Sequence, residues 1–195
     1  MNLINDPDTQ KSACTALDTL LEILHDDIEQ YLQLIMERLA VLLENTPISI
    51  KAVVIGAIGS AARTSKQDFL PYFQPAINHM VRFLTLTDEG EEIELRGQAM
   101  EAVGTFAEAV GEDAFRPYFP EMMKHAFSGM EAGNATLRKS SFLFFSTMAR
   151  VFGEDFTPYL PQVVPLLLTS CKQLEQGDST LPSLFHPSFF SIVSC

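Results

Sequence analysis

The sequence predicts an all-α protein, an α-solenoid (superhelix) of about four stacked helix pairs, from three observations. First, the tyrosines Tyr31, Tyr72, Tyr118 and Tyr159 lie 41, 46 and 41 residues apart, and their neighbours repeat with them. Second, an apolar block precedes each of the last three tyrosines. Third, apolar residues in these blocks recur every three or four positions, which is the period of a helix face. A period of about 40 to 47 residues is typical of HEAT and armadillo arrays.

The tyrosine blocks predict one helix of each pair. Asp68–Pro75, Ala114–Pro120 and Asp155–Pro161 share a Phe-x-Pro-Tyr core, whereas the first copy, Asp27–Leu32, lacks the proline. Proline is tolerated in the first turn of a helix, so Pro71 and Pro158 indicate helix starts. Asp68 and Asp155 are predicted as the N-cap residues. The phenylalanines of these blocks are predicted to be core: Phe69, Phe73, Phe115, Phe119 and Phe156.

The apolar blocks predict the other helix. They begin at Ile50, Leu95 and Leu137, each followed by a basic residue, and the last two end at glycines typical of helix C-termini, Gly111 and Gly153. We name these the B helices and the tyrosine-block helices the A helices. The expected B helices are 9–25, 47–66, 93–110 and 135–152, and the expected A helices are 27–44, 69–86, 114–130 and 156–175.

The expected domain organisation is one repeat array followed by a tail. The array covers residues 1–178, begins with a B helix that has no A partner and ends with an A helix that has no B partner. It is therefore interpreted as a slice from the middle of a longer solenoid. Residues 179–195 contain no charged residue and no helical period. We expect this apolar tail to be non-native or disordered.

The charge balance restricts the classes of partner. The chain has 25 acidic and 13 basic residues and a formal net charge of −12. Such a surface repels nucleic-acid phosphates and anionic lipids, so no direct nucleic-acid binding is expected, whereas a basic protein segment suits it. The alternative is that acidity only keeps the protein soluble. No apolar run reaches about 18 residues, so no membrane insertion is expected.

Catalytic and metal-binding patterns are not found in the sequence. The three cysteines and four histidines lack ligand spacing, and no nucleophile and base form a recognisable set. His79 and His125 each lie seven residues after a tyrosine, so they are interpreted as a structural repeat position. We expect no enzyme activity, no metal and no cofactor.

Two groups of acidic residues are candidate sites for basic cargo. Aligned B helices place a polar stripe on one face, which also includes Arg63, Arg150 and Glu154. The candidate cargo-binding acids on this stripe are Glu22, Asp26, Glu101, Glu108 and Glu112. The acid-rich segment between an A and a B helix contributes Asp88, Glu89, Glu91, Glu92 and Glu94. The stripe is either an ordinary solvated face or a groove for a basic peptide. The segment is either a solvating loop or an electrostatic attractor for lysine-rich cargo.

The repeats resemble the HEAT repeats of the importin-β superfamily of nuclear transport receptors (karyopherins), in particular its importin-4-like branch. The resemblance covers residues 9 to about 177. It is carried by Leu95–Gly104, by Leu137–Phe142, by Thr87–Arg96 and by the Gly-Glu-Asp-x-Phe-x-Pro-Tyr blocks. It implies a segment of an import receptor that shuttles between cytoplasm and nucleus. Cargo with basic nuclear-localisation signals and the GTPase Ran would bind the B-helix face, and phenylalanine-glycine nucleoporins the A-helix face. The alternative is a HEAT scaffold subunit that holds a complex together without Ran-dependent transport.

Overall fold

The computed structural model describes residues 6–24, 27, 29–86 and 90–176, and over these residues the regular structure is helical, with no strand. This confirms the predicted all-α class. The chain divides into two compact units, residues 1–157 and 158–195. Each unit is described by itself. The predicted boundary after residue 178 and the predicted tail lie outside the described residues and stay predictions.

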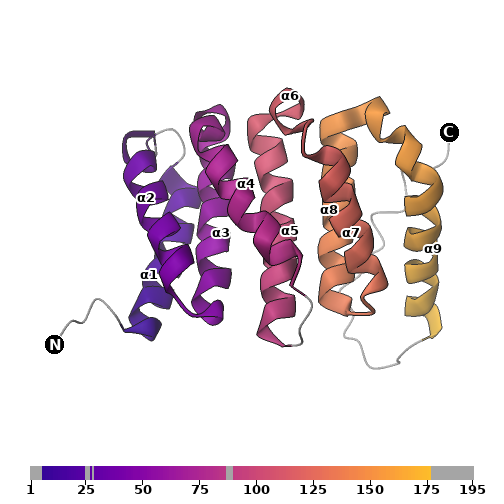
Figure 1. Ribbon diagram of the computed structural model, residues 1–195, viewed down its shortest axis with the longest axis horizontal. Helices are drawn as coiled ribbons and strands as arrows, with labels where there is room; N and C mark the ends of the chain where they lie inside the picture. The colour runs from indigo at the N-terminus through magenta and orange to yellow at the C-terminus, as the bar shows by residue number, and fades with distance from the viewer. Residues whose placement is uncertain (1–5, 25–26, 28, 87–89, 177–195) are drawn as a thin grey trace. The chain divides into compact units, whose positions relative to one another are not determined.

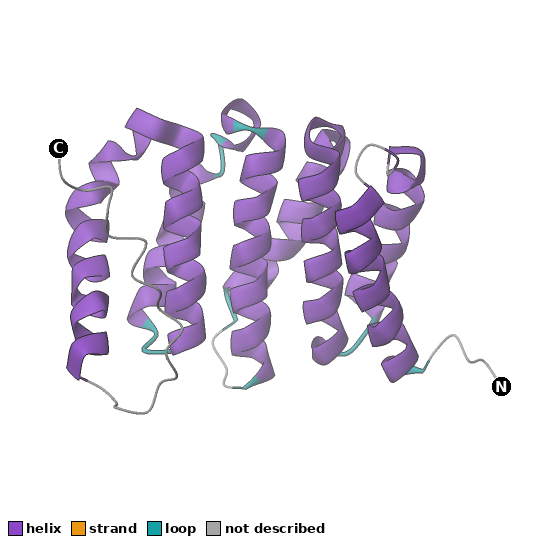
Figure 2. Ribbon diagram, turned by 180° about the vertical axis from the view of Figure 1, so that it is seen from behind, coloured by secondary structure: helices purple, strands orange, loops and turns teal. Residues whose placement is uncertain are grey.

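The first unit contains two layers of helices. The B layer contains helices that pack side by side in the order α1 (Pro7–Leu24), α3 (Ile48–Ser65), α5 (Glu91–Val110) and α8 (Ala135–Phe152). Figure 2 shows this layer in front. The A layer contains α2 (Glu29–Asn45), α4 (Leu70–Leu84) and α7 (Phe119–Glu131). Each A helix packs on the B helix that follows it, as Figure 1 shows for α4 and α5.

The core lies between these two layers, and α5 is its centre. Its residues Leu95, Ala99, Val103, Phe106 and Val110 are buried, at the three- and four-residue spacing that the sequence shows. A helix cannot bury so much of its surface against one partner, and α5 contacts α3, α4 and α8. The phenylalanines predicted as core are all buried, which confirms that interpretation: Phe69, Phe73, Phe115, Phe119 and Phe156.

Short helices connect α3 to α4, α5 to α7 and α8 to α9: η3 (Lys66–Phe69), α6 (Glu112–Phe115) and η4 (Gly153–Tyr159). They correct the N-cap predictions. Asp68 lies inside η3, and α4 has Phe69 at its N-cap without a side-chain cap bond. Asp155 lies inside η4 and accepts a hydrogen bond from Arg116. Because the connection is itself helical, a helical turn already precedes the backbone N–H groups that an aspartate side chain would otherwise cap.

The prolines and glycines divide in the same way between confirmed and corrected predictions. Pro71 occupies the first turn of α4 as predicted, whereas Pro158 lies inside η4, before α9 begins. Gly111 and Gly153 end α5 and α8 with φ values of 82° and 49°, which confirms both as C-terminal glycines. Lys66 takes the same place after α3 with φ of 50°, so the turn is imposed by the repeat even where no glycine is present.

The second unit contains α9 (Leu160–Gln176), which agrees with the A helix expected at 156–175 apart from its first turn. Pro165 lies inside this helix, and its carbonyl accepts a hydrogen bond of 2.8 Å from the Thr169 hydroxyl. Among the described helices, none combines the length and the hydropathy that crossing a membrane requires.

Candidate partner-binding surface

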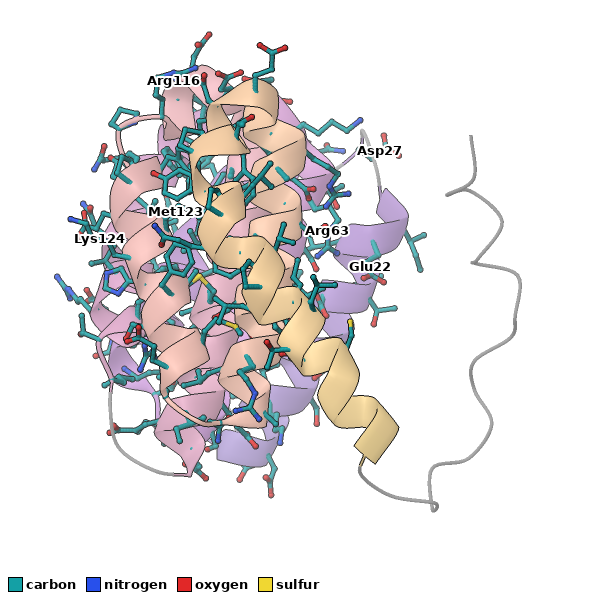
Figure 3. All side chains as sticks on the ribbon, turned by 90° about the vertical axis from the view of Figure 1, so that its right-hand side faces the viewer. Glu22, Asp27, Arg63, Arg116, Met123 and Lys124 are labelled. Atoms are coloured by element: carbon teal, nitrogen blue, oxygen red, sulfur yellow. The ribbon has the colours of Figure 1, made fainter. Side chains whose placement is uncertain are left out.

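The exposed side of the B layer carries a row of paired charges. A carboxylate oxygen of Glu22 on α1 lies 3.7 Å from a guanidinium nitrogen of Arg63 on α3. In the same way, a carboxylate oxygen of Glu108 on α5 lies 2.6 Å from a guanidinium nitrogen of Arg150 on α8. Figure 3 shows Glu22 and Arg63 on one side of the molecule and Lys124, on the A helix α7, on the opposite side. The role of the predicted polar stripe in binding stays a prediction, but these four of its residues form one polar face of the B layer. Its acids face arginines of the neighbouring B helix.

The first hollow on this surface lies between α3, α5 and α8 and has a volume of about 180 Å³. Arg63, Glu101 and Glu108 are its charged residues, and Leu143 and Phe144 contribute apolar wall. The Glu101 carboxylate accepts a hydrogen bond of 3.0 Å from the buried hydroxyl of Ser140 on α8. The neighbouring helix therefore fixes Glu101 in place. Two carboxylates beside apolar wall suit the ammonium group and aliphatic stem of a lysine.

The second hollow has a volume of about 410 Å³ and is bordered by α1, α3, α5 and α8. Asp18 and Glu94 are its charged residues, and neither forms an ion pair with any residue that the structure describes. One carboxylate oxygen of Asp18 is buried and has no hydrogen-bond partner within the described part of the chain. Sequence reasoning missed Asp18, although it lies four residues before Glu22, on the same face of α1.

The other predicted site residues lie elsewhere or outside the described residues. Glu112 does not share a helix face with Glu101 and Glu108, because α5 ends at Gly111 and Glu112 begins α6. The Glu112 carboxylate instead pairs with Arg116. Glu91, Glu92 and Glu94 belong to the first turn of α5 rather than to a loop, and there they complement the positive end of the helix dipole. Asp26, Asp88 and Glu89 lie outside the described residues.

Two other charged side chains link separate elements of the structure. Arg96 is buried and donates to the Leu86 carbonyl and the Ser128 hydroxyl, so it links the end of α4 to α7 across α5. Burial lowers the pKa of Arg96. Arg116 joins Glu112 to Asp155, and the hydrogen bond to Asp155 raises the pKa of its guanidinium. Burial lowers the pKa of His125, consistent with a structural role.

An apolar hollow of a different kind, about 210 Å³ in volume, lies between α2 and α4 of the A layer. Ile58 of α3 also lines it. Tyr72 and His79, which occupy two of the predicted repeat positions, border this hollow. The His79 imidazole also lies 3.9 Å from the Glu44 carboxylate. The remaining lining is mostly apolar: Met36, Glu37, Ala40, Leu43, Pro75 and Ala76. Within the described residues no group of histidine, cysteine, aspartate or glutamate side chains is arranged to hold a metal ion.

Two layers of stacked helix pairs, with polar hollows over one layer, define the class of HEAT-repeat α-solenoids. The sequence model described as "Importin subunit beta-1-like, TPR repeats" matches residues 2–183, so the chain belongs to the importin-β family. This confirms the resemblance that the repeat blocks carry.

Individual relatives agree with this assignment. The probable importin subunit beta-4 of Schizosaccharomyces pombe is 44% identical over 176 residues, which are 89% of this chain and 16% of that relative. Human importin-4 is 31% identical over 64% of this chain and 12% of its own length. The crystal structure of Kap121p bound to Ste12p has a TM-score of 0.78 at 26% identity, over 85% of this chain and 16% of that one. Kap121p has also been solved bound to Pho4p and to Nup53p. The chain thus spans about a sixth of the length of these relatives or less.

Proposed function

We propose that this chain is a segment of a nuclear import receptor, and that its B-helix face holds a basic segment of a cargo protein. The observation that carries the proposal is the gathering of carboxylates at two hollows of the B layer, Asp18 of α1 with Glu94 of α5 at one and Glu101 with Glu108, both of α5, at the other. The net charge of −12 favours a basic partner. The complexes of Kap121p with other proteins support a protein ligand for this fold. On this proposal the receptor shuttles between cytoplasm and nucleus, and it releases its cargo when Ran-GTP binds.

Neutralising the first hollow is the direct test. Glu101→Gln with Glu108→Gln is expected to weaken a labelled Lys/Arg-rich peptide about tenfold, because exposed ion pairs are each worth about 0.2–1 kcal/mol. Glu121→Gln with Glu131→Gln is the matched control, since it removes two exposed acids from the A helix α7. Fluorescence anisotropy across a salt series measures both, and affinity should fall as salt screens the charges. Equal losses in the two double variants would show that only net charge matters, and the groove proposal would be wrong.

The alternative, a HEAT scaffold without Ran-dependent transport, would use the same surface. A pulldown of cargo by the full-length gene product separates the two. Release of cargo on addition of Ran-GTP supports the receptor, and retention of cargo supports the scaffold.

A second binding function is favoured by the apolar hollow between α2 and α4. Its lining suits a phenylalanine side chain, and on this proposal it binds phenylalanine-glycine nucleoporins during transport. Ala40 borders the hollow from an exposed position, so Ala40→Trp should fill it and weaken a phenylalanine-glycine repeat peptide at least fivefold. Ala132→Trp, at an exposed position after α7, is the control. Unchanged peptide binding by Ala40→Trp, measured by calorimetry, would exclude this hollow.

A further inference from the structure

The two ion pairs on the B-helix face have the same construction. In each, the acid belongs to the earlier B helix and the arginine to the next one: Glu22 with Arg63, and Glu108 with Arg150. Arg150 also donates a hydrogen bond of 3.3 Å to the Thr147 hydroxyl one turn earlier, which holds the guanidinium beside Glu108. Arg63 additionally lines the hollow that contains Glu101 and Glu108, so a cation entering that hollow meets a positive charge.

These arginines differ from the arginine that holds the fold. Arg96 is only 7% exposed and bonds to two neighbouring elements. The side chains of Arg63 and Arg150 are 60% and 68% exposed. Exposed ion pairs contribute little to stability because solvent screens them and their side chains lose conformational entropy. The main consequence of the two arginines is therefore local, since each occupies a carboxylate that would otherwise be open to a ligand.

We propose that Arg63 and Arg150 are intramolecular competitors of the cargo. This proposal rests on the function proposed above. It assigns to the two arginines of the same surface the control of its affinity for cargo. A cargo cation competes with Arg150 for Glu108 and with Arg63 for Glu22. Within the part of the chain that the structure describes, no arginine pairs with Asp18 or Glu94, so a single basic residue binds that hollow first. Cargo with several basic residues gains the further pairs, and isolated surface lysines of other proteins do not. The two arginines thus set the affinity and the selectivity of the B-helix face.

The test is the affinity of the labelled Lys/Arg-rich peptide for the full chain with Arg63→Gln and Arg150→Gln combined. Arg38→Gln with Arg82→Gln is the matched control, because it makes the same change in net charge at exposed positions on the A helices α2 and α4. Competition predicts that the Arg63/Arg150 variant binds at least fivefold more tightly than the control. It also predicts that Glu108→Gln costs more affinity in the Arg150→Gln background than in the wild type, because Glu108 is then free to bind cargo.

The outcomes separate this proposal from the function on which it rests. If the Arg63/Arg150 variant binds no more tightly than the control while Glu101→Gln with Glu108→Gln still weakens binding, the competition is overturned and the cargo surface stands. If neither the wild type nor any variant prefers the basic peptide to an uncharged one of equal length, the proposed function fails and the competition fails with it. Circular dichroism melting of each variant checks that a change in affinity does not arise from unfolding.

Discussion

Replacing Phe115 with alanine is expected to lower the free energy of unfolding by about 3–5 kcal/mol, the range for removing a fully buried aromatic side chain. Phe115 has no exposed surface and lies in α6, the short helix that connects the B helix α5 to the A helix α7. Its ring centre is 6.0 Å from that of Phe73 in α4, 6.2 Å from that of Tyr118 and 6.3 Å from that of Phe152 in α8. Because these partners belong to successive repeats, the alanine variant loses packing on both sides of α6.

Urea unfolding followed by circular dichroism measures this effect. Tyr31→Ala is the control, since Tyr31 is the equivalent aromatic of the first tyrosine block but is 49% exposed, and its loss should cost about 0.5 kcal/mol or less. Phe115→Leu should lie between the two and keeps the comparison possible if the alanine variant does not fold. A loss below about 1 kcal/mol for Phe115→Ala would contradict the role of this cluster in joining the repeats.

Helix positions were predictable because the signal for them is local. The spacing of apolar residues placed the B helix at 135–152, and the structure has Ala135–Phe152. The glycines placed the ends of α5 and α8 correctly, because a positive φ favours glycine whatever the tertiary context. The N-cap prediction for Asp68 failed because the B-to-A connection is itself a helical turn, packed down by the buried Phe69. That packing depends on the neighbouring repeat.

The candidate site was less predictable because it depends on how residues about one repeat apart come together. The sequence placed Glu22, Arg63, Glu108 and Arg150 on one stripe, but the pairing of each acid with an arginine requires the register between helices. Glu112 was a different kind of error. The sequence indicates a helix end at Gly111, and a residue that follows a helix end does not share the face of that helix. Asp18 would belong to the predicted stripe if the stripe were shifted by one residue on α1.

The close approach of α7 and α8 could not be predicted from Gly129 alone, and it leads to the second large effect. Gly129 is buried on α7, and a Cβ atom added there would lie 2.5 Å from the Ser141 hydroxyl oxygen and 3.5 Å from the Leu137 carbonyl oxygen. Ser141 is only 1% exposed, so its side chain has little room to move away. Gly129→Ala is therefore expected to destabilise the protein by about 1–3 kcal/mol, the usual cost of overpacking.

The sign of this effect distinguishes packing from helix propensity. Alanine is favoured over glycine inside a helix by up to about 1 kcal/mol, so a glycine with free space around it should gain stability on the same substitution. Among the described residues, apart from its chain neighbours and its own helix backbone, no atom lies within 4 Å of a Cβ added at Gly56 on α3, and Gly56→Ala is expected to raise the free energy of unfolding. Ser141→Ala removes the oxygen that clashes and should restore part of the stability of Gly129→Ala, as a double-mutant cycle measures. If Gly129→Ala and Gly56→Ala change stability equally, the two helices are not in close contact at Gly129. If Ser141→Ala restores nothing, the contact that limits their approach is not the Ser141 hydroxyl.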